Sequence, residues 1–471
     1  MRELNIRKIF FAGLILALLA HLSWAIMTTD PKLQPGILLI DFILIGLFAV
    51  SIRNIRYGFL ASLLLLPFFF LLENISVISR VYQSQGDSFS LYTIDPRVIG
   101  FSLAYFFTLL MIFKNEKHFF QAPLSRVLPP VILYFCLSAL WAVEGANTWV
   151  QISFYLLLSS LFFLAYFSTK SLESFYRLIF FLIGLSVPAL LLSYYQLFSG
   201  LFYEYSDTDI KRISGPFDSP NLLGSFILFT SALAFILLLI TKSNKLLLRY
   251  RHWLMFYLLT ALPVLGMTFS RSAWLGALIF LGLFSLRKKS LFAGVLLGFS
   301  LLISLMLMFE PTRTRIDGFA ERRMFDSMYA RTNIWYLSHR KFMEKPWFGY
   351  GAGSFSTVIN DAKESANGTD NPHNDFVFFS VEGGLLGVLG YILIIGSFYF
   401  YLIKYHRQFK NYDDTTLSLL SWGLISLFIT FTVISLVESY YEGNFFHLFT
   451  WTTLGGWFGV AENASCQQKN S

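Results

Sequence analysis

The sequence has little charge and almost no cysteine. Only 14% of its 471 residues are charged, whereas a soluble domain carries about 25%, so this chain could not cover a water-exposed surface of ordinary composition. The shortage excludes an ordinary cytosolic enzyme and a disordered protein. The two cysteines, Cys136 and Cys466, exclude a disulfide scaffold. No Cys/His spacing indicates a metal site.

Apolar residues are abundant instead, at 55% of the chain. A membrane-spanning helix needs about 20 mostly apolar residues, and runs of that kind recur from one end of the sequence to the other. Leu, Phe and Ile fill them continuously, which favours helices over the alternating strands of a membrane barrel. We therefore expect an all-α polytopic membrane protein with about 12–14 transmembrane helices, residues 1–471 forming a single integral membrane domain. The expected spans are approximately 9–27, 36–52, 57–78, 97–113, 127–143, 149–168, 175–198, 221–241, 253–270, 272–286, 291–309, 373–403, 416–437 and 443–461.

The positions of lysine and arginine predict the orientation. If the N-terminus lies inside, 21 of the 36 basic residues fall in cytoplasmic segments and six in short outer loops, as the positive-inside rule requires. Both termini are then cytoplasmic. An alternative for the N-terminus is a signal peptide ending near Ser23-Trp-Ala25, but the charge count favours a retained first helix.

The remaining nine basic residues lie in one long outer loop, 310–372, on the side where the positive-inside rule disfavours them. This favours a functional role over an ordinary solvated loop. The stretch from Ala320 to Lys345 lacks Gly and Pro and carries apolar residues at near-helical spacing, which predicts an amphipathic helix over the membrane face, ended by Pro346. The nine are Arg313, Arg315, Arg322, Arg323, Arg331, Arg340, Lys341, Lys345 and Lys363.

Two outer loops before this segment carry further polar residues. Arg212 and Asn221 flank a Gly/Pro loop that opens a span, which is consistent equally with an anion site and with an ordinary capped loop. Arg271 follows Ser270 between two apolar runs, and an arginine there is costly unless it faces a polar cavity or a charged ligand. Snorkelling to lipid phosphates is the alternative for Arg271.

A third group surrounds the long outer loop. His373 opens the span that follows this loop, and a histidine at an outer boundary facing a basic surface suits general-base work. The other residues of the group are Arg331, Trp335, Asn374, Asp375 and Glu382. All three groups are expected on the same side of the membrane.

Taken in order, these motifs resemble those of the O-antigen ligase and polymerase superfamily. The resemblance covers about 210–400 in motifs, whereas 1–200 is matched by hydropathy only. The motifs are Arg212-Ile-Ser-Gly-Pro-Phe-x-Ser-Pro-Asn221, Thr268-x-Ser-Arg271-x-Ala-Trp-Leu-Gly276, Arg331-x-x-x-Trp335 with Lys345-Pro-Trp-Phe-Gly-Tyr-Gly-x-Gly353, and Pro372-His-Asn-Asp375 leading into Glu382-x-Gly-Leu-Leu-Gly387.

The resemblance implies a GT-C-type glycosyltransferase of the bacterial inner membrane that uses no metal and no cofactor. Its partners would be an undecaprenyl-diphosphate-linked glycan donor, a lipid A-core or other glycan acceptor and membrane lipids, with no nucleic acid. The active site would face the periplasm. Arg271 and Arg331 would neutralise the diphosphate, and His373 would accept the proton of the acceptor hydroxyl. The residues expected to bind substrate are Arg212, Asn221, Ser270, Trp335, Asn374, Asp375 and Glu382.

Other functions remain open at this stage. A repeat-unit polymerase and a protein O-glycosyltransferase would use the same lipid donor with another acceptor. A transporter or flippase for a polar lipid would place charges near the bilayer midplane, for which Asp41, Glu73 and Glu382 are candidates. The gathering of Arg271, Arg331 and His373 at one face favours one-sided chemistry over alternating access.

Overall fold

A computed structural model describes residues 119–143, 145–200, 203–205, 211–217, 219–241, 245–287, 323–362, 371–411, 415–438 and 446–470. They belong to one compact unit, Asn115–Ser471. The first four expected spans, the span 291–309, the N-terminal alternative and the acids Asp41 and Glu73 lie outside the described residues.

Helices make up nearly all of the described chain, and the prediction of an all-α membrane protein is confirmed. Five stretches are long and apolar enough to cross a membrane: Asn147–Ser168, Leu172–Ser199, Pro220–Ile240, Asp375–Lys410 and Thr415–Ile434. The helices are α5 (Leu128–Ser138), α6 (Gly145–Ser168), α7 (Leu172–Leu185), α8 (Val187–Ser199), α9 (Pro220–Ile240), α10 (Lys245–Arg249), α11 (Arg251–Met267), α12 (Arg271–Ser285), α15 (Arg323–Glu344), α16 (Phe355–Ala362), α17 (Asp375–Asn411), α18 (Thr415–Ile434) and α19 (Phe446–Asn470), with a 3-10 turn at Phe119–Gln121.

Two features differ from the expected pattern of spans. The run 175–198 is divided into α7 and α8 at Ser186, because Pro188 in the first turn of α8 has no N–H to continue the hydrogen bonding of α7. A small antiparallel hairpin joins strands β1 (Tyr203–Tyr205) and β2 (Lys211–Ile213), with Glu204 opposite Arg212. Strands of three residues are too short for an alternating pattern to reveal them.

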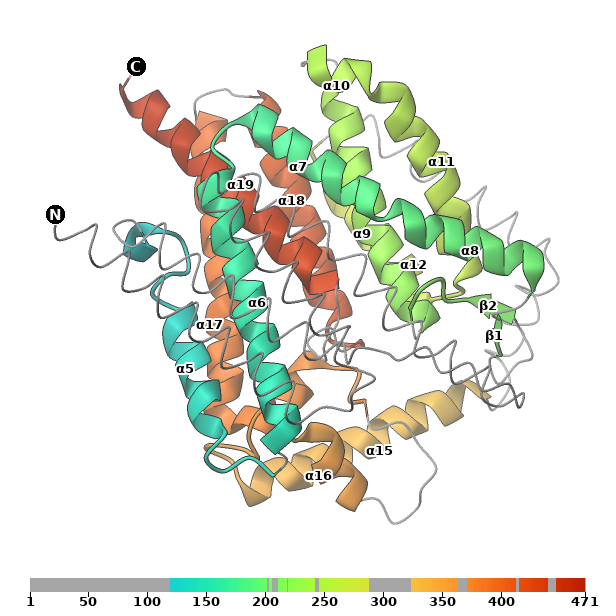
Figure 1. The fold of residues 1–471 in the computed structure, drawn as a ribbon, viewed down its shortest axis with the longest axis vertical. Coiled ribbons are helices and arrows are strands. Elements are labelled where there is room, and N and C mark those ends of the chain that lie inside the picture. Colours follow the sequence, from blue (N-terminus) through green and yellow to red (C-terminus); the bar gives the residue numbers. More distant parts are fainter. Residues whose placement is uncertain are drawn as a thin grey trace, which may run out of the picture. The chain divides into compact units, whose positions relative to one another are not determined.

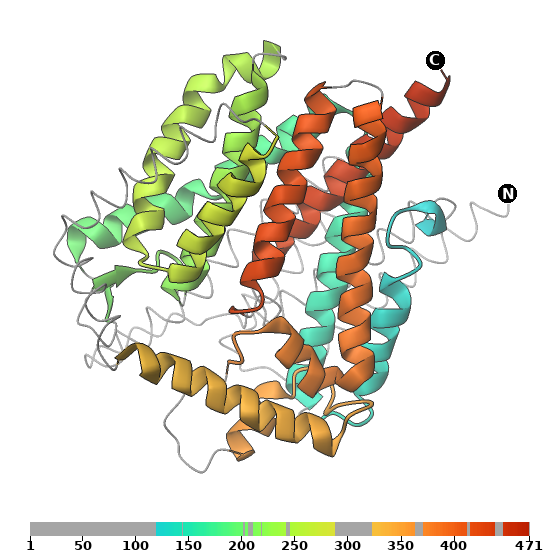
Figure 2. The same ribbon diagram turned by 180° about the vertical axis from the view of Figure 1, so that it is seen from behind.

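The helices pack as a bundle in which α6 contacts α19, α17 contacts α18, and α12 lies between α18 and α9 (Figures 1 and 2). The backbones of α6 and α19 approach each other closely, since a Cβ atom at Gly455 or Gly459 of α19 would overlap the carbonyl oxygen of Phe162 or Tyr166, respectively. Small residues at such positions let two membrane helices approach each other. Phe162 and Trp457 are fully buried beside them.

Gly455→Ala is therefore expected to destabilise the protein by about 1–3 kcal/mol, because the added methyl group meets backbone that cannot move aside. The midpoint of thermal unfolding in detergent measures the effect. Gly282→Ala on α12 is the matched control, since nothing lies within 4 Å of its added Cβ, and it should leave the midpoint unchanged or slightly raised. Equal midpoints for the two variants would show that the close approach is not needed.

The predicted helix of the long outer loop is confirmed as α15, which ends at Glu344, two residues before Pro346. It lies across one end of the bundle and not parallel to the spanning helices (Figure 2). Hydrogen bonds from Tyr350 and Lys341 hold its last residue and lower the pKa of Glu344.

Candidate functional site

The ends of five helices meet at the end of the bundle that α15 crosses. The first residues of α9, α12 and α17 lie there, together with the last residues of α11 and α18. Hydrogen bonds show this arrangement, since Asn221 of α9, Ser272 of α12 and His373 before α17 all contact Glu438, which follows α18. Residues far apart in the sequence are thereby brought within hydrogen-bonding distance of one another.

The Glu438 carboxylate is the centre of this cluster, although its side chain is only 11% exposed. Its Oε2 lies 3.0 Å from Nδ1 of His373. Its Oε1 accepts hydrogen bonds from Nδ2 of Asn221 at 3.0 Å and from Nη2 of Arg331 at 3.4 Å. The Ser272 hydroxyl donates to the same oxygen at 3.4 Å. A nearly buried carboxylate needs this many partners, because burying it unpaired is costly.

His373 is held in an unusual backbone conformation, with a φ of +48° in the left-handed region. Its N–H donates to Oδ1 of Asn371 at 2.7 Å. Oδ1 of Asn374 accepts from the first N–H groups of α17, and Nδ2 of the same side chain donates to the Leu436 carbonyl at 3.0 Å. Nε1 of Trp335 donates to the Pro372 carbonyl at 2.7 Å. Strained backbone that is fixed by its surroundings is typical of functional sites.

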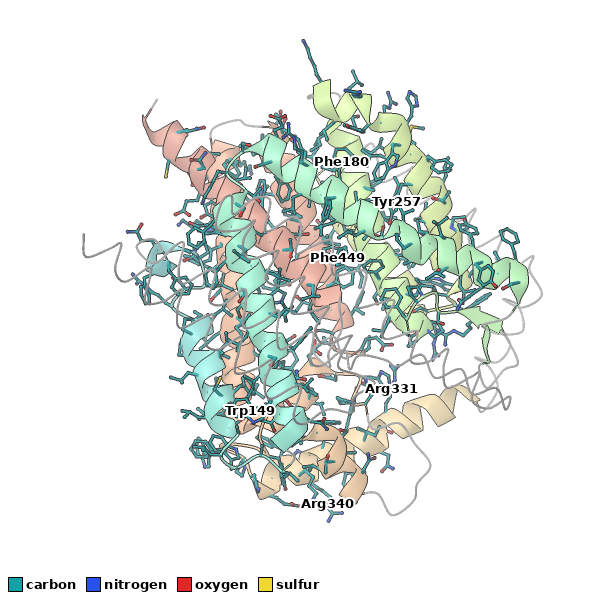
Figure 3. The ribbon with its side chains drawn as sticks, viewed as in Figure 1. Trp149, Phe180, Tyr257, Arg331, Arg340 and Phe449 are labelled. Atoms are coloured by element: carbon teal, nitrogen blue, oxygen red, sulfur yellow. The ribbon has the colours of Figure 1, made fainter. Side chains whose placement is uncertain are left out.

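Three arginines lie in or beside the cluster. Arg212 donates from Nε to the Thr268 carbonyl at 2.9 Å and from Nη2 to Oδ1 of Asn221 at 2.8 Å. Arg331 also donates from Nη1 to the Val437 carbonyl at 3.0 Å, and it points from α15 toward the bundle (Figure 3). Arg271, at the start of α12, lies within electrostatic range of Arg331 and Glu438. Arg331 thus contacts the Glu438 carboxylate directly, Arg271 lies within its electrostatic range, and Arg212 is joined to it through Asn221. Guanidinium groups gathered in this way suit an anionic ligand.

Ser270 fixes the start of α12. Its hydroxyl accepts a hydrogen bond from the N–H of Ala273 and lies 3.1 Å from the Ser272 hydroxyl. The preceding Phe269 has a φ of +48°. Gly224 of α9 comes close to this turn, since a Cβ there would lie 3.0 Å from the Cβ of Ser270. The turn that presents Arg271 is therefore fixed on both sides.

Asp375 and Glu382 are both buried. Oδ2 of Asp375 accepts from the Tyr391 hydroxyl at 3.5 Å, and its N–H donates to the Ser435 carbonyl. Glu382 accepts from the Phe355 N–H. Neither contacts Glu438 through the hydrogen bonds that the structure describes.

The glycine-rich turn 345–353 packs against a kink in α17 beside Glu382. Gly384 has a φ of +58°, and the Leu385 N–H donates to the Pro346 carbonyl at 2.7 Å. The N–H of Gly351 donates to the Glu382 carbonyl at 2.8 Å. A Cβ at Gly349 would lie 2.5 Å from that same carbonyl oxygen. This motif therefore joins the end of α15 to α17 through backbone contacts.

Glu438 is the residue that the sequence analysis missed. It follows the expected span 416–437 directly, on the same outer side as His373. An acidic residue at that boundary could have been taken as a candidate partner for the histidine. Nothing in the sequence shows that the end of α18 lies beside the start of α17. Among the described residues, no group of three or more His, Cys, Asp or Glu side chains is placed to hold a metal ion.

A family model described as O-antigen ligase matches residues 256–392. This range contains Arg271, Arg331 and His373, and it confirms the resemblance drawn from the motifs. Glu438 lies beyond it. No curated protein matches the chain.

Proposed function

We propose that the protein transfers a glycan from undecaprenyl diphosphate to a sugar hydroxyl of lipid A-core. The match of residues 256–392 to the O-antigen ligase family supports this proposal. The supporting observation is the pairing of His373 with Glu438 beside Arg271 and Arg331 at one end of the bundle. That end would face the periplasm, and both chain termini would lie in the cytoplasm.

His373 is suited to be the general base. A carboxylate next to Nδ1 favours the tautomer with the proton on Nδ1, which leaves the lone pair on Nε2 for a substrate proton. The His373 side chain is 21% exposed, so it remains open to an acceptor. In the proposed step the acceptor oxygen attacks the anomeric carbon while its proton moves to Nε2. Glu438 stabilises the imidazolium that forms.

The arginines are suited to the leaving group. As the bond between the anomeric carbon and the diphosphate oxygen breaks, its electron pair stays with the diphosphate, whose negative charge grows. Arg271 and Arg331 donate charge-assisted hydrogen bonds to that charge. Arg331 also contacts Glu438, so it links the leaving-group side of the site to the base.

Most of the other candidate residues would position these groups. Asn221 bonds to Glu438, and Arg212 holds Asn221 in place. Ser270 fixes the turn of Arg271, and Trp335 and Asn374 fix the turn of His373. Asp375 and Glu382 would support α17 from within the protein. Because the proposed reacting groups lie at one end of the bundle, the site supports transfer at one membrane face better than transport across it.

A deletion strain tests the choice of acceptor. Loss of a ligase leaves bare lipid A-core, whereas loss of a repeat-unit polymerase leaves core carrying one repeat, and the two differ on a gel of extracted lipopolysaccharide. We expect bare core and an accumulation of undecaprenyl-linked glycan. Core carrying one repeat would assign the protein to polymerisation, and an unchanged ladder would refute both functions.

A further inference from the structure

A cavity of about 490 Å³ lies at the opposite end of the bundle from Glu438. It is lined by Arg177, Phe180 and Phe181 of α7 and by Tyr250 and Trp253 at the start of α11; Figure 3 labels Phe180. Helix α9 fixes its position: it begins at the Glu438 cluster, ends at Ile240, and contacts α7, α10 and α11. At 1.5 Å per residue, α9 spans about 30 Å, the thickness of the hydrocarbon core of a bilayer.

Aromatic rings form the walls of this cavity. The ring centroid of Phe180 lies 4.9 Å from that of Tyr250 and 5.8 Å from that of Trp253. Tyrosine and tryptophan gather at the depth of lipid headgroups, because each has an apolar ring and a polar group. The walls are therefore of the kind found at the boundary between acyl chains and headgroups.

Arg177 lines the cavity, and three further basic residues lie in the chain just before or at the start of α11, close to Tyr250. Arg177, Lys245, Arg249 and Arg251 are all exposed. Within the part of the chain that the structure describes, only Arg177 among these four has a carboxylate within ion-pair distance, the Oε1 of Glu173 at 2.5 Å. That pair is 71% and 60% exposed, so it contributes little and exchanges readily for another anion. Among the described residues, this end of α7 and α11 thus carries more positive than negative charge.

An apolar surface continues from the cavity along α11. Phe256 and Leu259, which are 66% and 70% exposed, follow Trp253 along α11 away from the basic end, each turned about 60° further around the helix. A ligand that matches both parts has an anionic group at one end and long apolar chains at the other.

We propose that this cavity binds an anionic phospholipid of the leaflet opposite the Glu438 site. The Arg177 guanidinium donates to the phosphate oxygens, Arg249 and Arg251 add positive charge, and the acyl chains lie along Phe256 and Leu259. Basic pockets between membrane helices on the cytoplasmic side recognise such headgroups. This site is independent of glycan transfer.

Native mass spectrometry of the full chain in detergent, titrated with phosphatidylglycerol or phosphatidylcholine, tests the proposal. We expect preferential retention of phosphatidylglycerol. Arg177→Gln should weaken its binding about fivefold, the usual effect of one basic residue at an anionic membrane surface. Glu173→Gln should strengthen binding, because it releases Arg177, and a misfolded variant would not show that gain.

Arg407→Gln is the matched control, since this exposed arginine lies near the same end of the bundle on α17, outside the cavity. It should bind phosphatidylglycerol as the wild type does. Equal retention of the two lipids would overturn the proposal. So would an unchanged affinity in Arg177→Gln and Glu173→Gln, or displacement of the lipid by glycerol 3-phosphate at equal concentration, which would indicate a site for the free phosphate.

Discussion

Replacing Glu438 with glutamine is expected to lower kcat for glycan transfer by about 10²–10⁴-fold, because Glu438 acts through His373 and its loss can remove most of what that general base contributes. The amide fills the same space and can still contact Nδ1 of His373, but it carries no charge to stabilise the imidazolium and no longer favours the productive tautomer. KM for the donor should change little, because the arginines remain. Initial rates at saturating donor and acceptor measure the effect.

A double mutant sharpens this prediction. If Glu438 acts through His373, the variant carrying both His373→Ala and Glu438→Gln should be no slower than His373→Ala alone, since groups that act as a unit are not additive. Glu344→Gln, which changes an exposed carboxylate on α15, is the control and should keep the wild-type rate. Losses that multiply in the double mutant would show that Glu438 works independently of the histidine.

Replacing Arg271 with alanine is expected to lower kcat by about 10²–10³-fold, the usual cost of removing one group that stabilises charge in the transition state. Replacing Arg271 is easier to interpret than replacing Arg331, because Arg331 also bonds to Glu438 and to the Val437 carbonyl. Arg271→Lys should recover part of the rate, since a lysine keeps the charge and loses the planar donor geometry.

Arg340→Ala is the control for this series. Arg340 is exposed on α15 and points away from the bundle (Figure 3), so its loss should leave kcat unchanged. The thermal unfolding midpoint of each variant separates a folded, inactive protein from an unfolded one. A folded Arg271→Ala variant with wild-type kcat would remove Arg271 from the mechanism.

Much of the fold could be predicted from the sequence, because a bilayer allows few structures. Continuous apolar runs in a bilayer can only form helices. The helix of the long outer loop had to end near Pro346, because proline cannot continue a helix. The hairpin carrying Arg212 was not predictable, since its strands are held by a local register of three residue pairs. The division of 175–198 at Ser186 was foreseeable from Pro188 in principle.

Most residues of the site could be predicted from the sequence, but their contacts with one another could not. Arg271 was identified because a charge between apolar runs is costly unless it has a function. Arg331 belongs to an outer loop whose positive charge the positive-inside rule disfavours, and His373 opens the span that follows this loop. The motifs could not show that Asn374 caps α17 or that the glycines of 345–353 contact its kink, since both depend on backbone conformation. Glu438 was missed because its role depends on the packing of α18 against α17 and on the contact of Arg331 with the residues that follow α18.

Glycan transfer by the purified protein is the decisive test of the proposed function. The full chain in detergent would be mixed with a synthetic undecaprenyl-diphosphate glycan and isolated lipid A-core, without added nucleotide sugar, and the products separated by mass. The proposed function predicts core carrying the glycan, together with free undecaprenyl diphosphate in equal amount, and neither product with His373→Ala. Absence of both products with the folded wild-type protein, or unchanged product formation by His373→Ala, would contradict it.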